Sequence, residues 1–147
     1  MKKEIEITAR AVIQTRDKFL VCWHKEKRYY FYPGGHIKFG EAAKETLERE
    51  IEEEIGTKIK NCSFIGAVEN IYLENGQSHH EIILAFDVKL DKLKIKSKEN
   101  HIEFYLKTKE ELVKDKVFPI VLTKAILKWL RNKKLFWASQ IYGKTME

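Results

Sequence analysis

The segment from residue 41 to residue 56 constrains the fold of this chain most, because its apolar residues recur at helical spacing. The apolar face is formed by Leu47, Ile51 and Ile55. On the same helical wheel Glu54 falls inside this face and Glu50 lies at its edge. A carboxylate that faces a hydrophobic core is costly unless it has a partner. The sequence therefore predicts a core-packed helix that brings a carboxylate to a place where it needs a cation.

Glu50 and Glu54 are four positions apart and stack on one side of the predicted helix. Two carboxylates so placed repel each other unless a cation lies between them, and Mg²⁺ prefers oxygen ligands. A solvated, Glu-rich helix is an alternative that explains three other residues: Glu45, Glu48 and Glu52. It does not explain Glu54. In a second alternative, Arg49 simply neutralises the cluster as a salt-bridge partner.

The remaining pattern predicts two groups of strands, each followed by a helix. Strands are expected at 4–14, 19–23, 29–32, 63–73, 81–90 and 101–106, with one helical turn at 109–112 and a helix at 119–133. Asn75-Gly76 predicts a hairpin. This order indicates an α+β fold, an α/β/α sandwich with a mixed β-sheet between helices. We expect a single domain over residues 1–147, with 134–147 as a C-terminal tail.

Composition narrows the cellular setting. The N-terminal residues alternate in polarity instead of forming an apolar run, and no segment is long and apolar enough to span a bilayer. Two cysteines, Cys22 and Cys62, are too few for a disulfide framework. We therefore expect a cytoplasmic protein with no membrane partner. The net charge of +6 includes a strongly acidic segment at 41–56, so the rest of the chain is more basic than the total suggests. Such a chain suits a polyanionic ligand, although a lysine-rich solvated surface would look the same.

Residues 35–57 read GHIKFGEAAKETLEREIEEEIGT, which resembles the Nudix box, Gly-x5-Glu-x7-Arg-Glu-U-x-Glu-Glu-x-Gly-U, where U is aliphatic. All the fixed positions match: Gly35, Glu41, Arg49, Glu50, Glu53, Glu54 and Gly56. Ile51 satisfies the first aliphatic position, whereas Thr57 departs from the second. The order of strands around the box is also similar to that of the Nudix fold over about residues 4–132.

The resemblance implies a metal-dependent hydrolase that cleaves the pyrophosphate bond of a nucleoside diphosphate linked to another moiety. It implies Mg²⁺ as the cofactor, with Mn²⁺ as a substitute. The metal-binding residues would be Gly35, through its carbonyl, Glu50, Glu53 and Glu54. Arg49 would orient these carboxylates and pair with Glu41, and Glu53 would be the catalytic base.

Other residues are expected to complete the site. Related enzymes often recruit a carboxylate from a loop outside the box, and Glu99 is the first choice here, with Glu81 and Glu103 as competitors. His36, in the box loop, could contact a phosphate. Of the adjacent pair His79-His80, one side chain should face the cleft, and His80 is predicted as the substrate contact. The aromatic run 29–32 would give a base-stacking platform that includes Tyr32, or simply core packing.

The box implies the reaction but leaves the substrate open among free nucleotides, nucleotide sugars, dinucleoside polyphosphates and the 5′ end of RNA. A non-catalytic nucleotide- or RNA-binding module on the same fold is the alternative function, suggested by the basic remainder of the chain. The apolar residues of the tail, 135–142, must be buried somewhere. They could pack on the parent domain, or form a homodimer interface in which Phe136 and Trp137 contribute contact area.

Overall fold

The computed structural model describes residues 3–93 and 96–146, and its strands form two sheets. The larger sheet has six strands in the order β10-β9-β6-β7-β1-β5. In chain order they are β1 (Ile5–Val12), β5 (Gly34–His36), β6 (Ile59–Glu74), β7 (Gln77–Leu90), β9 (Phe136–Ile141) and β10 (Lys144–Met146). β1 pairs with β7, and β6 with β9, in parallel, whereas the other neighbours are antiparallel. The sheet is therefore mixed, as predicted.

The smaller sheet is antiparallel and was not expected as a separate unit. It consists of β2 (Gln14–Thr15), β3 (Lys18–His24), β4 (Tyr29–Phe31) and β8 (Ile102–Thr108). β3 lies at its centre and pairs with each of the other three. Periodicity predicted strands in this part of the chain, but it carries no information on which strands pair, so it could not predict a second sheet.

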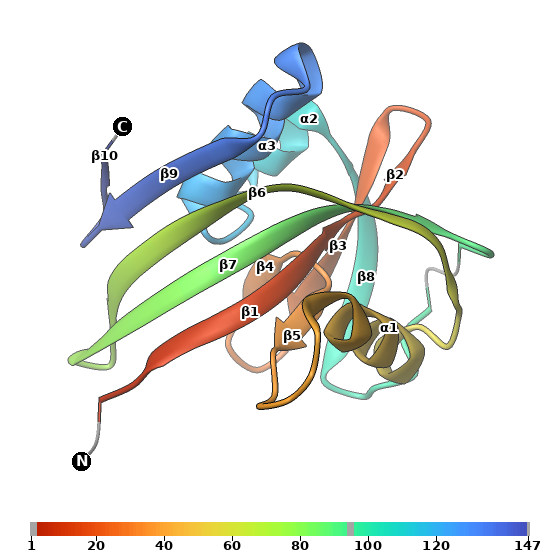
Figure 1. The fold of residues 1–147 in the computed structure, drawn as a ribbon, viewed down its shortest axis with the longest axis horizontal. Helices are drawn as coiled ribbons and strands as arrows, with labels where there is room; N and C mark the ends of the chain where they lie inside the picture. The colour runs from red at the N-terminus through yellow and green to blue at the C-terminus, as the bar shows by residue number, and fades with distance from the viewer. Residues whose placement is uncertain (1–2, 94–95, 147) are drawn as a thin grey trace.

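Helices cover the strands on both sides. The helices are α1 (Ala43–Glu54), α2 (Lys109–Lys114) and α3 (Ile120–Asn132). Figure 1 shows α1 at the lower right, and α2 and α3 at the top on the other side of the sheet. One core cluster joins α1 to β1 and β7, and the other joins α2 and α3 to β6 and β7. This arrangement confirms the predicted α+β sandwich.

The predicted helices and the hairpin are confirmed. α1 ends at Glu54, and Gly56, which follows the C-cap Ile55, has the positive φ of 81° expected just after a helix. The β6–β7 hairpin turns at Asn75-Gly76, both with positive φ, as a two-residue turn of this type requires. Both strands of the hairpin are longer than predicted, because their polar ends continue the ladder beyond the apolar run.

The tail packs on the parent domain instead of remaining loose. β9 pairs with β6, and Phe136 packs against the core formed with α3, at the place where Gly66 leaves room for its ring. A Cβ at Gly66 would lie 2.5 Å from the Phe136 ring. Phe136 therefore contributes mainly to its own core, whereas Trp137 is 59% exposed.

Among the helices of the described residues, none is long and apolar enough to cross a membrane.

Candidate active site

Strand β5 and helix α1 approach each other closely at Gly35, where a side chain would displace the Glu50 carboxylate. A Cβ at Gly35 would lie 2.5 Å from Glu50 Oε1, so the missing side chain makes room for the Glu50 carboxylate. β5 pairs with β1, which fixes Gly35 opposite Ala9. The glycine carbonyl and the first helix carboxylate are thus held at the same edge of the larger sheet.

Glu54 is the buried carboxylate of the site. It is 3% exposed, and Cys22 Sγ on β3 donates to its Oε2 at 3.8 Å. Burial raises the pKa of Glu54 to about 9, and the neighbouring Glu50 carboxylate adds to the rise, while the charge of Arg10 partly opposes it. A carboxylate in this position favours a proton or a cation as its partner.

Arg49 holds the other acidic residues in place. Its guanidinium donates to Glu41 Oε2 at 2.9 Å and to Glu50 Oε1 at 2.7 Å, and it lies 3.6 Å from Glu53 Oε2. The Arg49 bond, together with a 2.7 Å bond from the Thr46 hydroxyl, lowers the pKa of Glu41 to about 2. Arg49 is therefore placed both to neutralise the negative charge of the cluster and to orient its carboxylates. From the sequence these two roles were separate interpretations.

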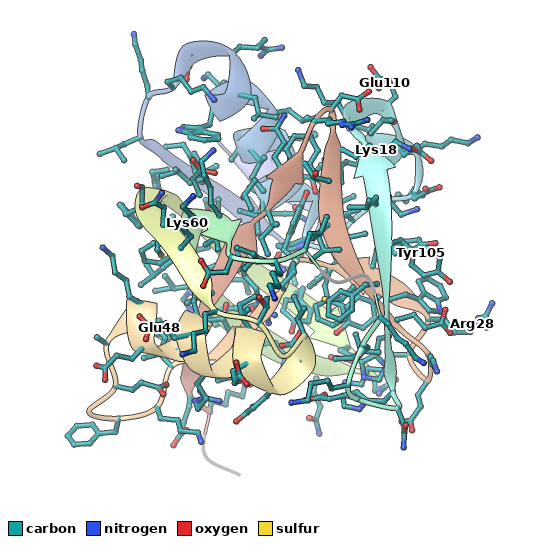
Figure 2. All side chains as sticks on the ribbon, turned by 90° about the vertical axis from the view of Figure 1, so that its right-hand side faces the viewer. Lys18, Arg28, Glu48, Lys60, Tyr105 and Glu110 are labelled. Carbon is teal, nitrogen blue, oxygen red and sulfur yellow. The ribbon has the colours of Figure 1, made fainter. Side chains whose placement is uncertain are left out.

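The remaining glutamates of α1 divide between the site and solvent. The Glu53 side chain is 51% exposed and stays within reach of Arg49. Glu48 and Glu52 are exposed, and Figure 2 shows Glu48 on the outer side of α1. The predicted division of the helix into a core face, a site edge and a solvated side is present in the structure.

The donor set suits a hard divalent ion. Glu50, Glu53, Glu54 and the Gly35 carbonyl offer only oxygen atoms, and the buried Glu54 has no cation of its own on α1. Within residues 3–93 and 96–146, however, no three His, Cys, Asp or Glu side chains already converge as a metal site. Arg49 explains why the carboxylates do not converge, because its guanidinium draws Glu50 and Glu53 toward itself.

Of the three carboxylates considered outside the box, Glu99 is the one whose charge acts on Glu54 and Cys22. Its charge contributes to the raised pKa of Glu54, and the backbone N–H of Lys98 donates to the Glu54 carbonyl at 2.9 Å. Glu99 also lies 3.2 Å from His101 Nε2. Glu103 instead accepts a bond from the Tyr105 hydroxyl at the surface, and Glu81 lies in the pocket described next.

A pocket of about 250 Å³ opens beside β5, between the larger sheet and the start of α3. Its lining includes His36 and Arg10, together with rings from three segments: Tyr29, Phe31, Tyr72 and Phe118. Arg10 donates to the Tyr32 carbonyl at 3.2 Å, and its charge also acts on Glu54. The pocket and the carboxylate cluster are therefore parts of one site.

Two predicted substrate contacts lie elsewhere. Tyr32 is 1% exposed and shares a 2.7 Å hydrogen bond with the Thr123 hydroxyl, so its side chain belongs to the core while Tyr29 and Phe31 line the pocket. His80 points to the opposite face of the sheet, 3.6 Å from Glu69 Oε2. Its neighbour His79 lines the pocket instead. Alternation along the strand was predicted correctly, but the choice of face was not.

Sequence reasoning missed Arg10 and Cys22 as members of the site. Both lie on strands. Arg10 is placed by the pairing of its strand at Gly34, and Cys22 by pairing at Phe104, and in each case the partner residue is far away in sequence. The alternation of residues 4–14 gave no signal for Arg10, because it places Arg10 on the polar face of the strand with Glu6 and Thr8.

A family model described as NUDIX domain matches residues 5–126. The fold is similar to that of a MutT mutator protein from Bacillus halodurans, with a TM-score of 0.72 and 19% identity over 97% of this chain and 95% of that one. A NUDIX hydrolase from Nitrosomonas europaea matches with a TM-score of 0.73 and 17% identity, over 90% and 93% of the two chains. A MutT protein from Methanosarcina mazei Go1 matches with a TM-score of 0.71 and 22% identity, over 91% of this chain and 99% of that one.

Proposed function

The chain belongs to the Nudix family of pyrophosphohydrolases, which generally use divalent metal ions, and on that premise we propose that it cleaves a nucleoside diphosphate linked to another moiety. The observation that carries the proposal is the buried Glu54 beside Glu50, at the edge of a pocket that contains Arg10. Acidic groups that can bind a metal and a basic group that can bind a phosphate lie together.

Mg²⁺ is the proposed cofactor, with Mn²⁺ as a substitute. The residues that would hold it are Glu50, Glu53, Glu54 and the Gly35 carbonyl. A bound divalent ion would supply charge neutralisation on the phosphates and lower the pKa of water. The high pKa of Glu54 fits this role, because a cation replaces the proton that the buried carboxylate otherwise favours.

The other residues would bind and orient the reactants. Glu53, the most exposed of the three carboxylates, is the proposed base that takes a proton from the attacking water. Arg49 keeps Glu50 and Glu53 in position through its bond to Glu41. Arg10 would bind a phosphate oxygen, and Glu99 would accept a hydrogen bond from water.

A turnover screen over nucleotide derivatives tests the proposal, with Mg²⁺ and Mn²⁺ supplied separately. We expect nucleoside monophosphate or inorganic phosphate to be released from at least one compound and to need the metal. Thermal melting gives a second measurement, because an ion that binds only the native state raises Tm. Millimolar Mg²⁺ should raise Tm, and Glu50→Gln should reduce that rise. No turnover and no metal-dependent rise in Tm would contradict the proposal.

A second candidate function, binding of an RNA 5′ region, is favoured by a basic groove of about 440 Å³ between α3 and β9. Lys124, Lys128 and Lys134 line it beside Trp129. Lysines and an aromatic ring together suit a single strand. Binding of 5′-triphosphate RNA that weakens when Lys124 and Lys128 are replaced by Gln would support this function, and binding that is unaffected by these changes would contradict it.

A further inference from the structure

The floor of the pocket beside β5 is polar and fixed. Glu81 on β7 is buried, and the Thr8 hydroxyl donates to its Oε1 at 3.1 Å. A carboxylate offers about four lone-pair sites, so this bond leaves capacity for donors from a ligand. Neighbouring strand β6 places Asn70 directly opposite Glu81 in the antiparallel ladder. An acceptor and an amide therefore lie side by side on the same face of the sheet.

Asn70 is the unusual member of this pair. It is 0% exposed, and within the described residues neither its Oδ1 nor its Nδ2 has a hydrogen-bond partner. A buried amide without partners is destabilising, and each such group in a folded protein calls for an explanation. Asn70 is not among the residues that line the pocket, but it lies next to Glu81, which does, so a ligand held by Glu81 would reach its amide once the Asn70 side chain turns toward the pocket.

The walls of the pocket suit a flat heteroaromatic ring. Phe118 packs edge-on against Tyr29 and Tyr72, with ring centroids 5.8 Å and 5.4 Å apart, and Phe31 lies 5.4 Å from Tyr29. Base–aromatic stacking tolerates any base, because every base has a π-face. The walls therefore favour a nucleobase as a class, and the choice among bases falls to the floor.

The pocket also has a direction. Arg10 and His36 line it on the side of β5, whose Gly35 contacts the Glu50 carboxylate. If phosphates lie toward that side, as the proposed function requires, the base points toward Glu81 and Asn70.

We propose that this pocket selects the base of a guanine nucleotide through Glu81 and Asn70. The Glu81 carboxylate accepts bonds from guanine N1–H and the 2-amino group, and the Asn70 side chain turns toward the pocket so that its Nδ2 donates to O6. This inference rests on the proposed function for the orientation of the nucleotide, and it adds the identity of the base.

The other bases fit the same floor poorly, as their hydrogen-bonding edges show. Adenine and cytosine each present a ring nitrogen lone pair where guanine presents N1–H, and that lone pair would face the carboxylate. Uracil presents one N–H between two carbonyl oxygens, so one oxygen would also face Glu81. Hypoxanthine keeps N1–H and O6 but lacks the 2-amino group. It is therefore the closest probe of the second bond to Glu81.

Binding in the absence of divalent metal tests the inference without relying on catalysis. GDP, IDP and ADP are titrated into the full chain in EDTA and followed by calorimetry. A hydrogen bond to a charged group implies that GDP binds about tenfold or more tightly than IDP, and ADP should bind more weakly still. This comparison needs no variant, so it cannot be confused with a folding defect. GDP that does not bind, or that binds no better than IDP, overturns the inference.

Glu81→Gln provides the second measurement, because it keeps the shape of the side chain and replaces one acceptor oxygen by a donor. It should remove most of the preference for GDP over IDP. Glu69→Gln is the matched control: Glu69 is a half-buried glutamate of β6 on the opposite face of the sheet, bonded by the Ser139 hydroxyl at 2.9 Å. It should keep the preference. A preference that survives Glu81→Gln would overturn the assignment of Glu81.

The proposed function and the base assignment can fail separately. Hydrolysis of guanine and hypoxanthine nucleotides at equal kcat/KM, with equal binding, would leave the proposed function standing and remove the base assignment. Selective binding of GDP without hydrolysis of any derivative would support the base assignment and remove the proposed function.

Discussion

Glu54 lies on the apolar face of α1, and its replacement separates a structural role from a functional one. We predict that Glu54→Gln keeps the fold, because glutamine has nearly the same shape and, like the protonated carboxyl that the raised pKa of Glu54 favours, carries no charge. It should lower kcat by at least about two orders of magnitude, because a lost metal ligand removes charge stabilisation in the transition state. Steady-state kinetics with saturating Mg²⁺ and a circular dichroism spectrum would measure the two effects.

The control for this change is Glu52→Gln, two positions away on the solvated side of the same helix. It should leave kcat nearly unchanged. Equal activity in the two variants would remove Glu54 from the metal site.

Glu41 gives a prediction about acid stability. Its pKa in the folded protein is about 2, lowered first by the Arg49 bond and then by the Thr46 hydroxyl. An unfolded glutamate has a pKa of about 4.3. The contribution of Glu41 to stability is therefore present above about pH 4.3 and is lost as the pH falls toward 2. Urea unfolding between pH 6 and pH 2 should show that the free energy of unfolding falls less with pH in Glu41→Gln than in the unmodified chain. Glu48→Gln, at an exposed position, should leave the profile unchanged, and the same result for Glu41→Gln would contradict the prediction.

For single residues, the sequence predicted correctly the side-chain positions that depend on one helix, and it missed those that depend on how strands pair. The helical wheel placed Glu54 in the core and Glu52 in solvent because both belong to one regular element. The positions of Tyr32 and His80 depend on which face of a strand meets the pocket, and that follows from the pairing of distant strands. Arg10 was missed for the same reason.

Among the elements, β8 and α2 are joined by a buried ion pair. Lys107 is largely buried on β8, and its Nζ lies 2.7 Å from Asp115 Oδ2 at the end of α2 and 4.0 Å from the centre of the Tyr30 ring. We predict that Asp115→Asn lowers the free energy of unfolding by about 2 kcal/mol, because it leaves a buried ammonium without its counter-charge. Chemical denaturation would measure the change.

Asp91→Asn is a suitable comparison, since Asp91 is an exposed residue just after β7. It should change the free energy of unfolding by less than about 0.5 kcal/mol. If the two variants lose similar amounts of the free energy of unfolding, the Lys107–Asp115 pair adds no more stability than an exposed charge.

The elements that the sequence predicted best are those with local signals. Asn75-Gly76 fixed the hairpin, and Gly56 fixed the end of α1. β5 and β10 were missed because each has three residues, too few for a period to show, and neither has an aromatic run such as the one that marked the equally short β4. β9 was missed because the residues of the tail became a strand only through its pairing with β6.

For the whole molecule, the open question is whether a second copy binds. Trp137 remains exposed although Phe136 is packed, and Leu135 and Tyr142 are also exposed in the same segment. We predict a homodimer in which Trp137 contributes contact area, because exposed aromatic residues are enriched at interfaces. Light scattering over a concentration series should show the dimer, and Trp137→Ser should shift it toward the monomer.

A change at Trp137 is preferable to removal of residues 135–147, which would also remove β9 and the Phe136 contact. Lys18→Gln, at an exposed position of β3 in the smaller sheet, is the control and should not change the oligomeric state. If the unmodified chain is monomeric at high micromolar concentration, the dimer prediction is wrong.

The parallel pairing of β1 with β7 also determines how the chain can fold. Thr8 and Glu81, which are hydrogen-bonded across this pairing, are 73 residues apart in sequence, and Ser139 and Glu69 on β9 and β6 are 70 apart. Contacts of such separation require a long loop to close before they contribute stability, so folding is slow. We therefore expect β1 to remain unpaired until the β6–β7 hairpin has formed beside it. This interval, in which an unpaired strand is open to other chains, is the stage at which a refolding solution of the protein would be most prone to aggregate.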